Sequence, residues 1–187
     1  MKRLLNAVIA LLVLVLLAGA GAIWYVWPTE SLDFQHEEVP LQDRAIDMAL
    51  ALSPDLELTA EDVNNLAKAS LSQKKQYQPD VELTGANFHF SRDRLIADVN
   101  IKWKGILPVG LTLTYRLDWQ APNLVATVEE AKIRGISLNT DWFEPVYMPI
   151  GEQLPRIIKV DQVRVSDGKL IATLRLPNVD DLKALLR

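Results

Sequence analysis

Cysteine is absent from the 187 residues, and histidine occurs only twice. Without cysteine, the chain forms neither a disulfide bond nor the lipid-modified cysteine of a lipoprotein anchor. The two histidines, His36 and His89, lie far apart in the sequence, so a zinc site or a His-based triad would lack most of its parts. We therefore expect no catalytic residues, no metal site and no cofactor.

Runs of basic residues and nucleotide-binding motifs are also missing. Beyond the N-terminus, the only basic pair is Lys74-Lys75, and the formal net charge is -4, so the sequence has no nucleic-acid footprint. It contains no Gly-x-Ser-x-Gly elbow and no Gly-rich phosphate loop. These absences favour a non-enzymatic protein.

Adjacent carboxylates offer the remaining route to acid-base catalysis. Glu61-Asp62 and Asp180-Asp181 fall in predicted first turns of helices, where the helix dipole favours negative charge. Glu129-Glu130 falls on a predicted strand, whose neighbouring side chains point to opposite faces. A hydrolase that uses Glu129 and Glu130 is the alternative that these residues leave open.

One long hydrophobic run, residues 4–27, dominates the N-terminus. At about 1.5 Å rise per residue, it is long enough to cross a hydrocarbon layer of about 30 Å as a helix. Lys2 and Arg3 precede it and four acidic residues follow, namely Glu30, Asp33, Glu37 and Glu38. The positive-inside rule then keeps the N-terminus cytoplasmic and places the rest of the chain on the extracytoplasmic side of the cell membrane.

A cleavable secretory signal is the competing interpretation of this run, because Ala18-Gly19-Ala20 is typical of a cleavage site. The apolar run continues past these small residues to Trp24, Tyr25 and Trp27. Their amphipathic rings suit the membrane interface, so we interpret the run as a retained anchor with these three residues at the outer surface.

Two prolines divide the chain after the anchor. Pro28 ends the hydrophobic run, and Pro40 closes a polar, acidic stretch that we interpret as a stalk. The predicted organisation is a cytoplasmic N-terminus (1–3), a transmembrane anchor (4–27), a stalk (28–40) and one extracytoplasmic α+β domain (41–187).

The domain begins with apolar residues at helical spacing. Segments in which apolar and polar residues alternate follow. Helices are expected at 41–52 and 60–72, the second with Thr59 as N-cap. Alternating residues predict an antiparallel meander covered by these helices, with strands at 81–90, 95–103, 111–120, 124–133 and 136–138. A bulge is expected near Gly85, and an apolar loop at 105–110.

The last third of the chain gives weaker signals. Pro145 and Pro149 predict a short or broken helix within 141–153. Asp167-Gly168 predicts a hairpin between strands 157–165 and 170–176, and a final helix is expected at 179–186.

One face of the predicted sheet is unusually apolar and aromatic. If it is a groove, an acyl chain or another apolar ligand would lie on it; if it is covered, the same residues form a filled core. The candidate ligand-binding residues are Val99, Ile101, Trp103, Leu113, Tyr115, Leu117 and Trp119. The apolar loop at 105–110 and Met148-Pro149-Ile150 are candidates to dip into the membrane or to contact a partner.

The order of elements resembles a known family. An N-terminal membrane helix, the segment 58–66, the strands 81–90 and 95–103, the segment 107–115 and the late hairpin 160–176 resemble the YpmS-type family of small bacterial membrane-anchored proteins. More loosely, the helix start at 58–64 before a long meander looks like the tubular lipid-binding (TULIP-like) bacterial domains. That resemblance implies a curled sheet around an apolar channel, and a role in envelope lipid handling or beside extracytoplasmic lipases.

Two functions follow as expectations. The first is a single-pass membrane protein whose domain binds lipid or another apolar ligand. The second is an envelope scaffold or accessory protein with a filled core that binds a protein partner, for example a secreted lipase.

Overall fold

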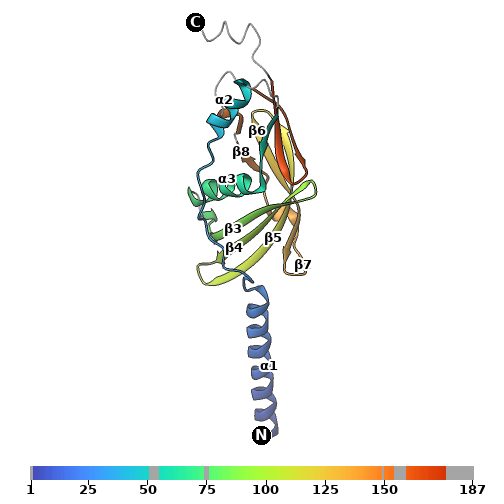
Figure 1. The fold of residues 1–187 in the computed structure, drawn as a ribbon. Coiled ribbons are helices and arrows are strands. Elements are labelled where there is room, and N and C mark those ends of the chain that lie inside the picture. Colours follow the sequence, from blue (N-terminus) through green and yellow to red (C-terminus); the bar gives the residue numbers. More distant parts are fainter. Residues whose placement is uncertain (1, 51–54, 74–75, 149, 154–158, 176–187) are drawn as a thin grey trace.

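The computed structural model describes residues 2–50, 55–73, 76–148, 150–153 and 159–175. Figure 1 shows an N-terminal helix that projects from a mostly antiparallel β domain with a few helices. This arrangement confirms the α+β class.

The projecting helix is α1 (Lys2–Val26). Its window Ile9–Val26 has a mean hydropathy of 2.5, and none of that window is buried inside the protein. A fully exposed apolar helix of this length is costly in water and stable in lipid. By length and composition, α1 is therefore a candidate membrane anchor, as expected.

Two sheets make up the β domain. The larger sheet has the strand order β2-β3-β4-β5-β6-β7, and β8 also pairs with β6. Its strands are β2 (Gln76–Gln78), β3 (Val81–Ser91), β4 (Arg94–Trp103), β5 (Leu107–Gln120), β6 (Asn123–Ile133), β7 (Ile136–Ser137) and β8 (Val146–Met148). The smaller sheet has the order β1-β10-β9, with β1 (Asp55–Leu58), β9 (Lys159–Ser166) and β10 (Lys169–Arg175).

The large sheet is open, which corrects the expected curled form. Its first strand, β2, and its last, β7, do not pair with each other. The late hairpin β9–β10 pairs with β1 in the second sheet, so its backbone groups do not extend or close the first one.

Most predicted elements are confirmed near their expected bounds. Helices α2 (Leu41–Leu50) and α3 (Ala60–Gln73) match the two expected helices, and the register shift between Leu83 and Gly85 is the expected bulge. The strand β1, with its alternating Asp-Leu-Glu-Leu sequence, was not predicted, because four residues give little periodicity. The helix expected at 179–186 lies outside the described residues.

One loop prediction is wrong. Residues 107–110 of the expected loop belong to β5 and pair with β4, so only 104–106 turn, and the apolar segment continues a strand. Within 141–153, where a short or broken helix is expected, the structure has the edge strand β8 and then the short helix α4 (Ile150–Gln153). An edge strand tolerates prolines at its ends, because its outer N–H groups need no partner strand.

Two hydrophobic clusters hold the domain together. The distal cluster joins the small sheet to α2 and to the far ends of β5 and β6, around Leu56, Leu58, Leu124, Leu170, Ala172 and Leu174. The proximal cluster lies in the large sheet nearer α1, around Leu83, Ala86, Ala97, Val99, Ile101, Val109, Leu113, Val128 and Ala131. Helix α3 contributes Val63 and Leu66 to the first and Leu71 to the second, so it spans both.

Candidate functional site

The seven residues predicted to line a groove are divided between the two clusters. Val99, Ile101 and Leu113 are buried in the proximal cluster, with exposed fractions of 6%, 9% and 6%. Leu117 and Trp119 pack instead against the distal cluster. These five side chains therefore take part in packing, three in the proximal cluster and two against the distal cluster.

Tyr115 and Trp103 complete the predicted set. Tyr115 packs against the proximal cluster, and burial, with a smaller contribution from Tyr77, raises the pKa of its phenol, so the hydroxyl stays protonated. Trp103 lies at the end of β4 with 45% of its surface exposed, and Lys104 Nζ is 4.9 Å from its ring centroid.

Residues 28–40, expected to be a stalk, lie against the domain; we call this segment the strap. The strap crosses a row of three paired residues on adjacent strands, Gly110, Asn100 and Gly85. A Cβ on Gly85 would lie 2.1 Å from the carbonyl oxygen of Leu32, and one on Gly110 would lie 3.0 Å from Cα of Pro28. Only residues without a side chain allow so close an approach of two backbones.

Hydrogen bonds hold the strap in this row. The buried Asn100 side chain donates from Nδ2 to the carbonyl oxygen of Glu30 at 2.7 Å, and Ala86 N donates to the carbonyl oxygen of Asp33 at 3.2 Å. Lys68 Nζ on α3 lies 3.6 Å from Asp33 Oδ1. The strap therefore connects α1 to the sheet at several points and does not act as a free spacer.

The sequence alone does not predict this row. It predicts a bulge near Gly85 and places Gly110 in a loop. Their alignment with Asn100 depends on the register of three strands, so the signal appears only after the sheet is assembled.

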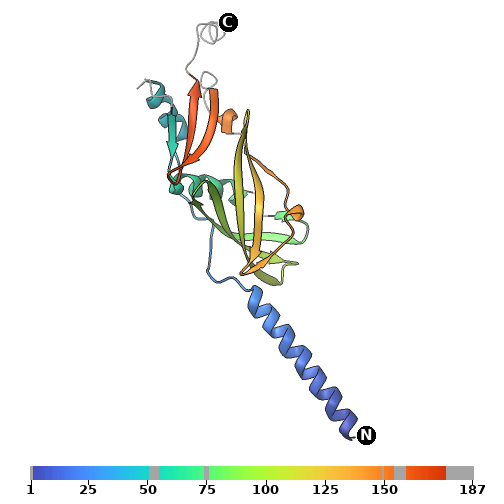
Figure 2. The same ribbon diagram turned by 90° about the vertical axis from the view of Figure 1, so that its right-hand side faces the viewer.

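The end of the domain nearest α1 is rich in exposed apolar residues. Two hairpin tips, residues 104–106 and 134–136, lie beside the outer end of α1 in both views (Figures 1 and 2). We call them the membrane-end tips. Ile106 is 82% exposed and Ile136 is 56% exposed.

Arg134 connects one tip to the predicted interface residues. Its guanidinium carbon lies 5.1 Å from the Trp24 ring centroid and 5.4 Å from that of Tyr25. Its Nη2 also lies 3.5 Å from the carbonyl oxygens of Trp24 and Trp27. The end of α1 therefore has direct contacts with the β6–β7 turn as well as with the strap.

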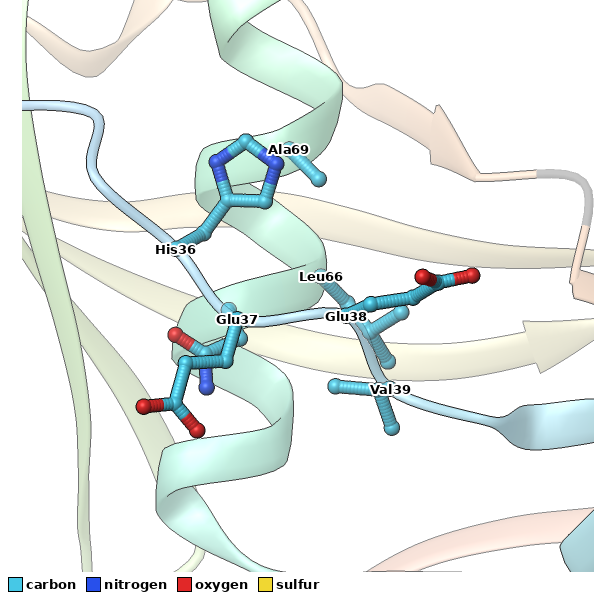
Figure 3. A pocket seen from close by; sticks show the side chains of 7 residues that line it. His36, Glu37, Glu38, Val39, Leu66 and Ala69 are labelled. Carbon is cyan, nitrogen blue, oxygen red and sulfur yellow. The ribbon is translucent and has the colours of Figure 1, made fainter.

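A shallow pocket of about 380 Å³ lies between the strap and α3. Val39, Leu66 and Ala69 supply its apolar surface, and Figure 3 shows Glu37 and Glu38 extending away from each other at its rim. Carboxylates at the rim repel an anionic headgroup. This pocket is a poor match for an acidic lipid.

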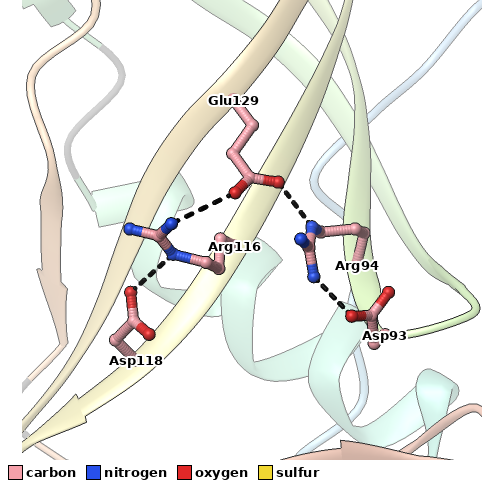
Figure 4. Close-up of polar contacts among 5 residues, drawn as sticks. All are labelled: Asp93, Arg94, Arg116, Asp118 and Glu129. Atoms are coloured by element: carbon pink, nitrogen blue, oxygen red, sulfur yellow. Dashed lines mark hydrogen bonds and ion pairs between the residues drawn. The ribbon is translucent and has the colours of Figure 1, made fainter.

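Glu129 and Glu130, the candidates for catalysis, are engaged in ion pairs. Glu129 is the extra residue at a register shift and accepts from Arg94 and Arg116, which also pair with Asp93 and Asp118 in the chain of contacts of Figure 4. Glu130 Oε1 lies 2.6 Å from Lys132 Nζ. Both carboxylates are therefore held by neighbouring basic side chains.

Asp62 anchors the start of α3 to α2. Its Oδ2 accepts from Thr59 N at 2.9 Å and from Arg44 Nη1 at 2.8 Å, while Asp62 N donates to Thr59 Oγ1 at 3.1 Å, which confirms Thr59 as the N-cap. Burial alone would raise the pKa of Asp62, but the hydrogen bonds from Arg44 and Thr59 outweigh it and leave the pKa below its ordinary value. The Asp62 carboxylate therefore has two structural functions, since it caps α3 with Thr59 and joins α3 to α2 through Arg44.

An exposed aromatic edge lies beside β6. The 3-10 turn η1 (Thr140–Trp142) presents Trp142, which is 62% exposed, and β8 presents Tyr147, which is 60% exposed. Strand β8 pairs through one side with β6. Exposed aromatic side chains next to an edge strand are typical of protein-binding surfaces.

Metal chemistry has no assembled site in the part of the chain that the structure describes, because no three His, Cys, Asp or Glu residues come together there. His89 Nδ1 lies 3.8 Å from Asp98 Oδ2, and Asp98 accepts from Thr112 Oγ1 at 2.8 Å.

Comparison with known proteins adds no assignment: no protein family, no curated protein and no solved structure matches this chain.

Proposed function

We propose that this chain is a single-pass, N-in membrane protein whose extracytoplasmic domain is a non-catalytic scaffold that binds a protein partner of the cell envelope. The observation that carries the proposal is the filled sheet face. Val99, Ile101 and Leu113, which would line a lipid groove, are buried among other side chains. A filled core leaves the outer surface of the domain for binding.

The exposed edge formed by Trp142 and Tyr147 is the surface best suited to a protein partner. Both side chains are more than half exposed, and large aromatic residues are the ones that carry most binding energy in interfaces. The strap supports the same function, because it fixes the orientation of this edge relative to α1 and hence to the membrane.

Lipid handling is the second candidate, and one observation favours it. The exposed Ile106 and Ile136 lie beside the outer end of α1, so lipid contact is possible at the bilayer surface without an internal groove. This form of lipid contact is compatible with a filled core.

Site-specific photo-crosslinking of the full chain in its own cell membrane tests the proposal. A photoreactive phenylalanine at Trp142 or Tyr147 should give one discrete protein adduct, while the same probe at exposed Glu130 serves as the matched control. Absence of an adduct at both aromatic positions, or an equal adduct at Glu130, would overturn the proposal.

The absence of native cysteine gives a clean test of topology. In intact cells, an impermeant maleimide should label Asp167→Cys, which lies in the exposed β9–β10 turn. Labelling only after the membrane is permeabilised would place the domain in the cytoplasm and contradict the N-in orientation.

A further inference from the structure

The membrane-end tips combine tight turns with exposed apolar side chains. In the first tip, Lys104 and Gly105 have φ of 50° and 68°, and Ile106 N donates to the carbonyl oxygen of Trp103 at 3.1 Å. In the second, Arg134 has a φ of 52° and the turn joins Ile133 to Ile136. The turns are ordered by their own backbone geometry, so they hold Ile106 and Ile136 outward without needing a protein partner.

Folding does not explain the apolar character of these tips. Ile106 is 82% exposed, so it contributes little to either hydrophobic cluster. An isoleucine side chain that stays exposed to water gives the fold no stabilisation by burial. The same side chain at the acyl boundary of a bilayer is stabilised by burial.

Each turn carries one cation, Lys104 in the first tip and Arg134 in the second, while Lys102 lies opposite Glu82 and Lys132 pairs with Glu130. Lys104 lies over Trp103, and Arg134 lies over Trp24 and Tyr25. Cations next to aromatic rings are typical of the headgroup region of a membrane, and they attract anionic lipid.

We propose that both membrane-end tips rest in the headgroup and acyl boundary of the leaflet from which α1 emerges. Ile106 and Ile136 enter the apolar boundary, and Lys104 and Arg134 contact anionic headgroups. The occupant of this surface is the lipid bilayer itself. The position of α1 supports it, because the contacts of Arg134 with Trp24 and Tyr25 hold the second tip at the end of α1, and the first tip lies beside that end in both views.

This inference rests on the anchor in the proposed function, but not on the protein partner. It adds a contact between the domain and the membrane to the one that α1 already makes. The helix α1, the strap and the membrane-end tips would then together hold the domain in one orientation over the bilayer.

Depth-dependent quenching in nanodiscs tests the proposal with the full chain. Single Ile106→Cys and Ile136→Cys variants carry an environment-sensitive fluorophore, in discs of phosphatidylcholine and phosphatidylglycerol with brominated acyl chains. Asp167→Cys is the matched control, since Asp167 has a φ of 52° in a similar tight turn at the other hairpin. We expect a loss of emission at both isoleucine positions and none at Asp167; unquenched emission at both isoleucine positions would overturn the proposal.

Two results separate this inference from the proposed function. Quenching at the tips without an adduct at Trp142 or Tyr147 would support membrane docking and overturn the protein-binding scaffold. An adduct at Trp142 or Tyr147 with unquenched emission at both tips would support the protein-binding scaffold and overturn membrane docking.

Lys104→Gln in the Ile106→Cys background should reduce the loss of emission if the headgroup contact is correct, and an unchanged loss would remove that contact from the proposal.

Discussion

Two hairpin tips have nearly the same backbone conformation, but one carries an exposed apolar side chain and the other is polar. At the β4–β5 tip, Lys104 and Gly105 have φ of 50° and 68°; at the β9–β10 tip, Asp167 and Gly168 have φ of 52° and 73°. The first tip presents Ile106, and the second is polar. Because the turn geometry is satisfied in both, the difference reflects what surrounds each tip and not what the backbone needs.

The two ends of the domain also differ in how they are attached. At the membrane end, the strap contacts β4 through Glu30 and Asn100, and α1 contacts the β6–β7 turn through Trp24 and Arg134. At the distal end, α2 is joined to α3 through the Arg44 and Asp62 pair. The comparison predicts that damage at one end leaves the other intact.

The largest effect is expected from Gly85→Ala, which would break the attachment at the membrane end. The new Cβ would overlap the Leu32 carbonyl, and either the strap or β3 must move, so the free energy of unfolding should fall by about 3 kcal/mol. Urea denaturation of the full chain in detergent measures this. Gly168→Ala in the β9–β10 turn is the control and should cost about 1 kcal/mol, because only its positive φ is strained. Equal losses in the two variants would contradict the tight passage of the strap.

The next effect, at the distal end, is expected from Asp62→Asn. The variant loses a charged acceptor for Arg44 and Thr59 and should destabilise the fold by about 2 kcal/mol at neutral pH. Because the pKa of Asp62 is lowered in the folded state, its contribution is present above the unfolded pKa of about 3.9 and is lost as the pH falls through the folded pKa. Chemical denaturation across this pH range should show the variant and the original chain converge at low pH. The exposed neighbour Glu61→Gln is the control, and a loss as large as that of Asp62→Asn would contradict the specific role of Asp62.

A smaller effect is expected from Asn100→Ala, which removes one hydrogen bond to the strap. The cost should be about 1 kcal/mol. Hydrogen exchange should show faster exchange near residues 30–33 and 85–86, with no change in β9 and β10. Lys102→Ala on the same strand is the control, and faster exchange at the distal hairpin would show that the two ends are not independent.

The smallest effect on stability is expected from Ile106→Ser. A side chain that is 82% exposed contributes little to folding. The free energy of unfolding, measured by thermal unfolding in detergent, should therefore change by less than about 0.5 kcal/mol. In nanodiscs, however, this variant should reduce the quenching of a fluorophore at Ile136→Cys, while Asp167→Ser should have no effect. A large loss of stability would mean that Ile106 belongs to the fold.

Local signals predicted most strands and two helices well. Thr59 as N-cap, the bulge near Gly85 and the Asp167-Gly168 turn each depend on residues close in sequence, and each is confirmed. The sequence predicts a loop for the apolar segment 105–110, in which Leu107 and Val109 alternate with Pro108 and Gly110. Pairing with β4 decided that residues 107–110 belong to a strand.

The candidate site was less accessible to sequence reasoning. The sequence placed Trp103, Leu113 and Trp119 on one apolar face, and the structure keeps them on strands of one sheet. It distributes the face over two clusters, however, and exposes Trp103 at the end of β4. Alternation identifies an apolar face, but it carries no information about what covers that face.

The sequence by itself determined the hydrophobic run of α1, the α+β class and the alternation of the main strands, because these depend on neighbours within a few residues. Only the tertiary structure decided that the segment after α1 is a bound strap and that the late hairpin forms a second sheet. The contact between Asn100 and Glu30 spans 70 residues, and the pairing of β1 with β10 spans more than half of the chain. Such contacts depend on the free energy of the assembled chain, which no local window of residues contains.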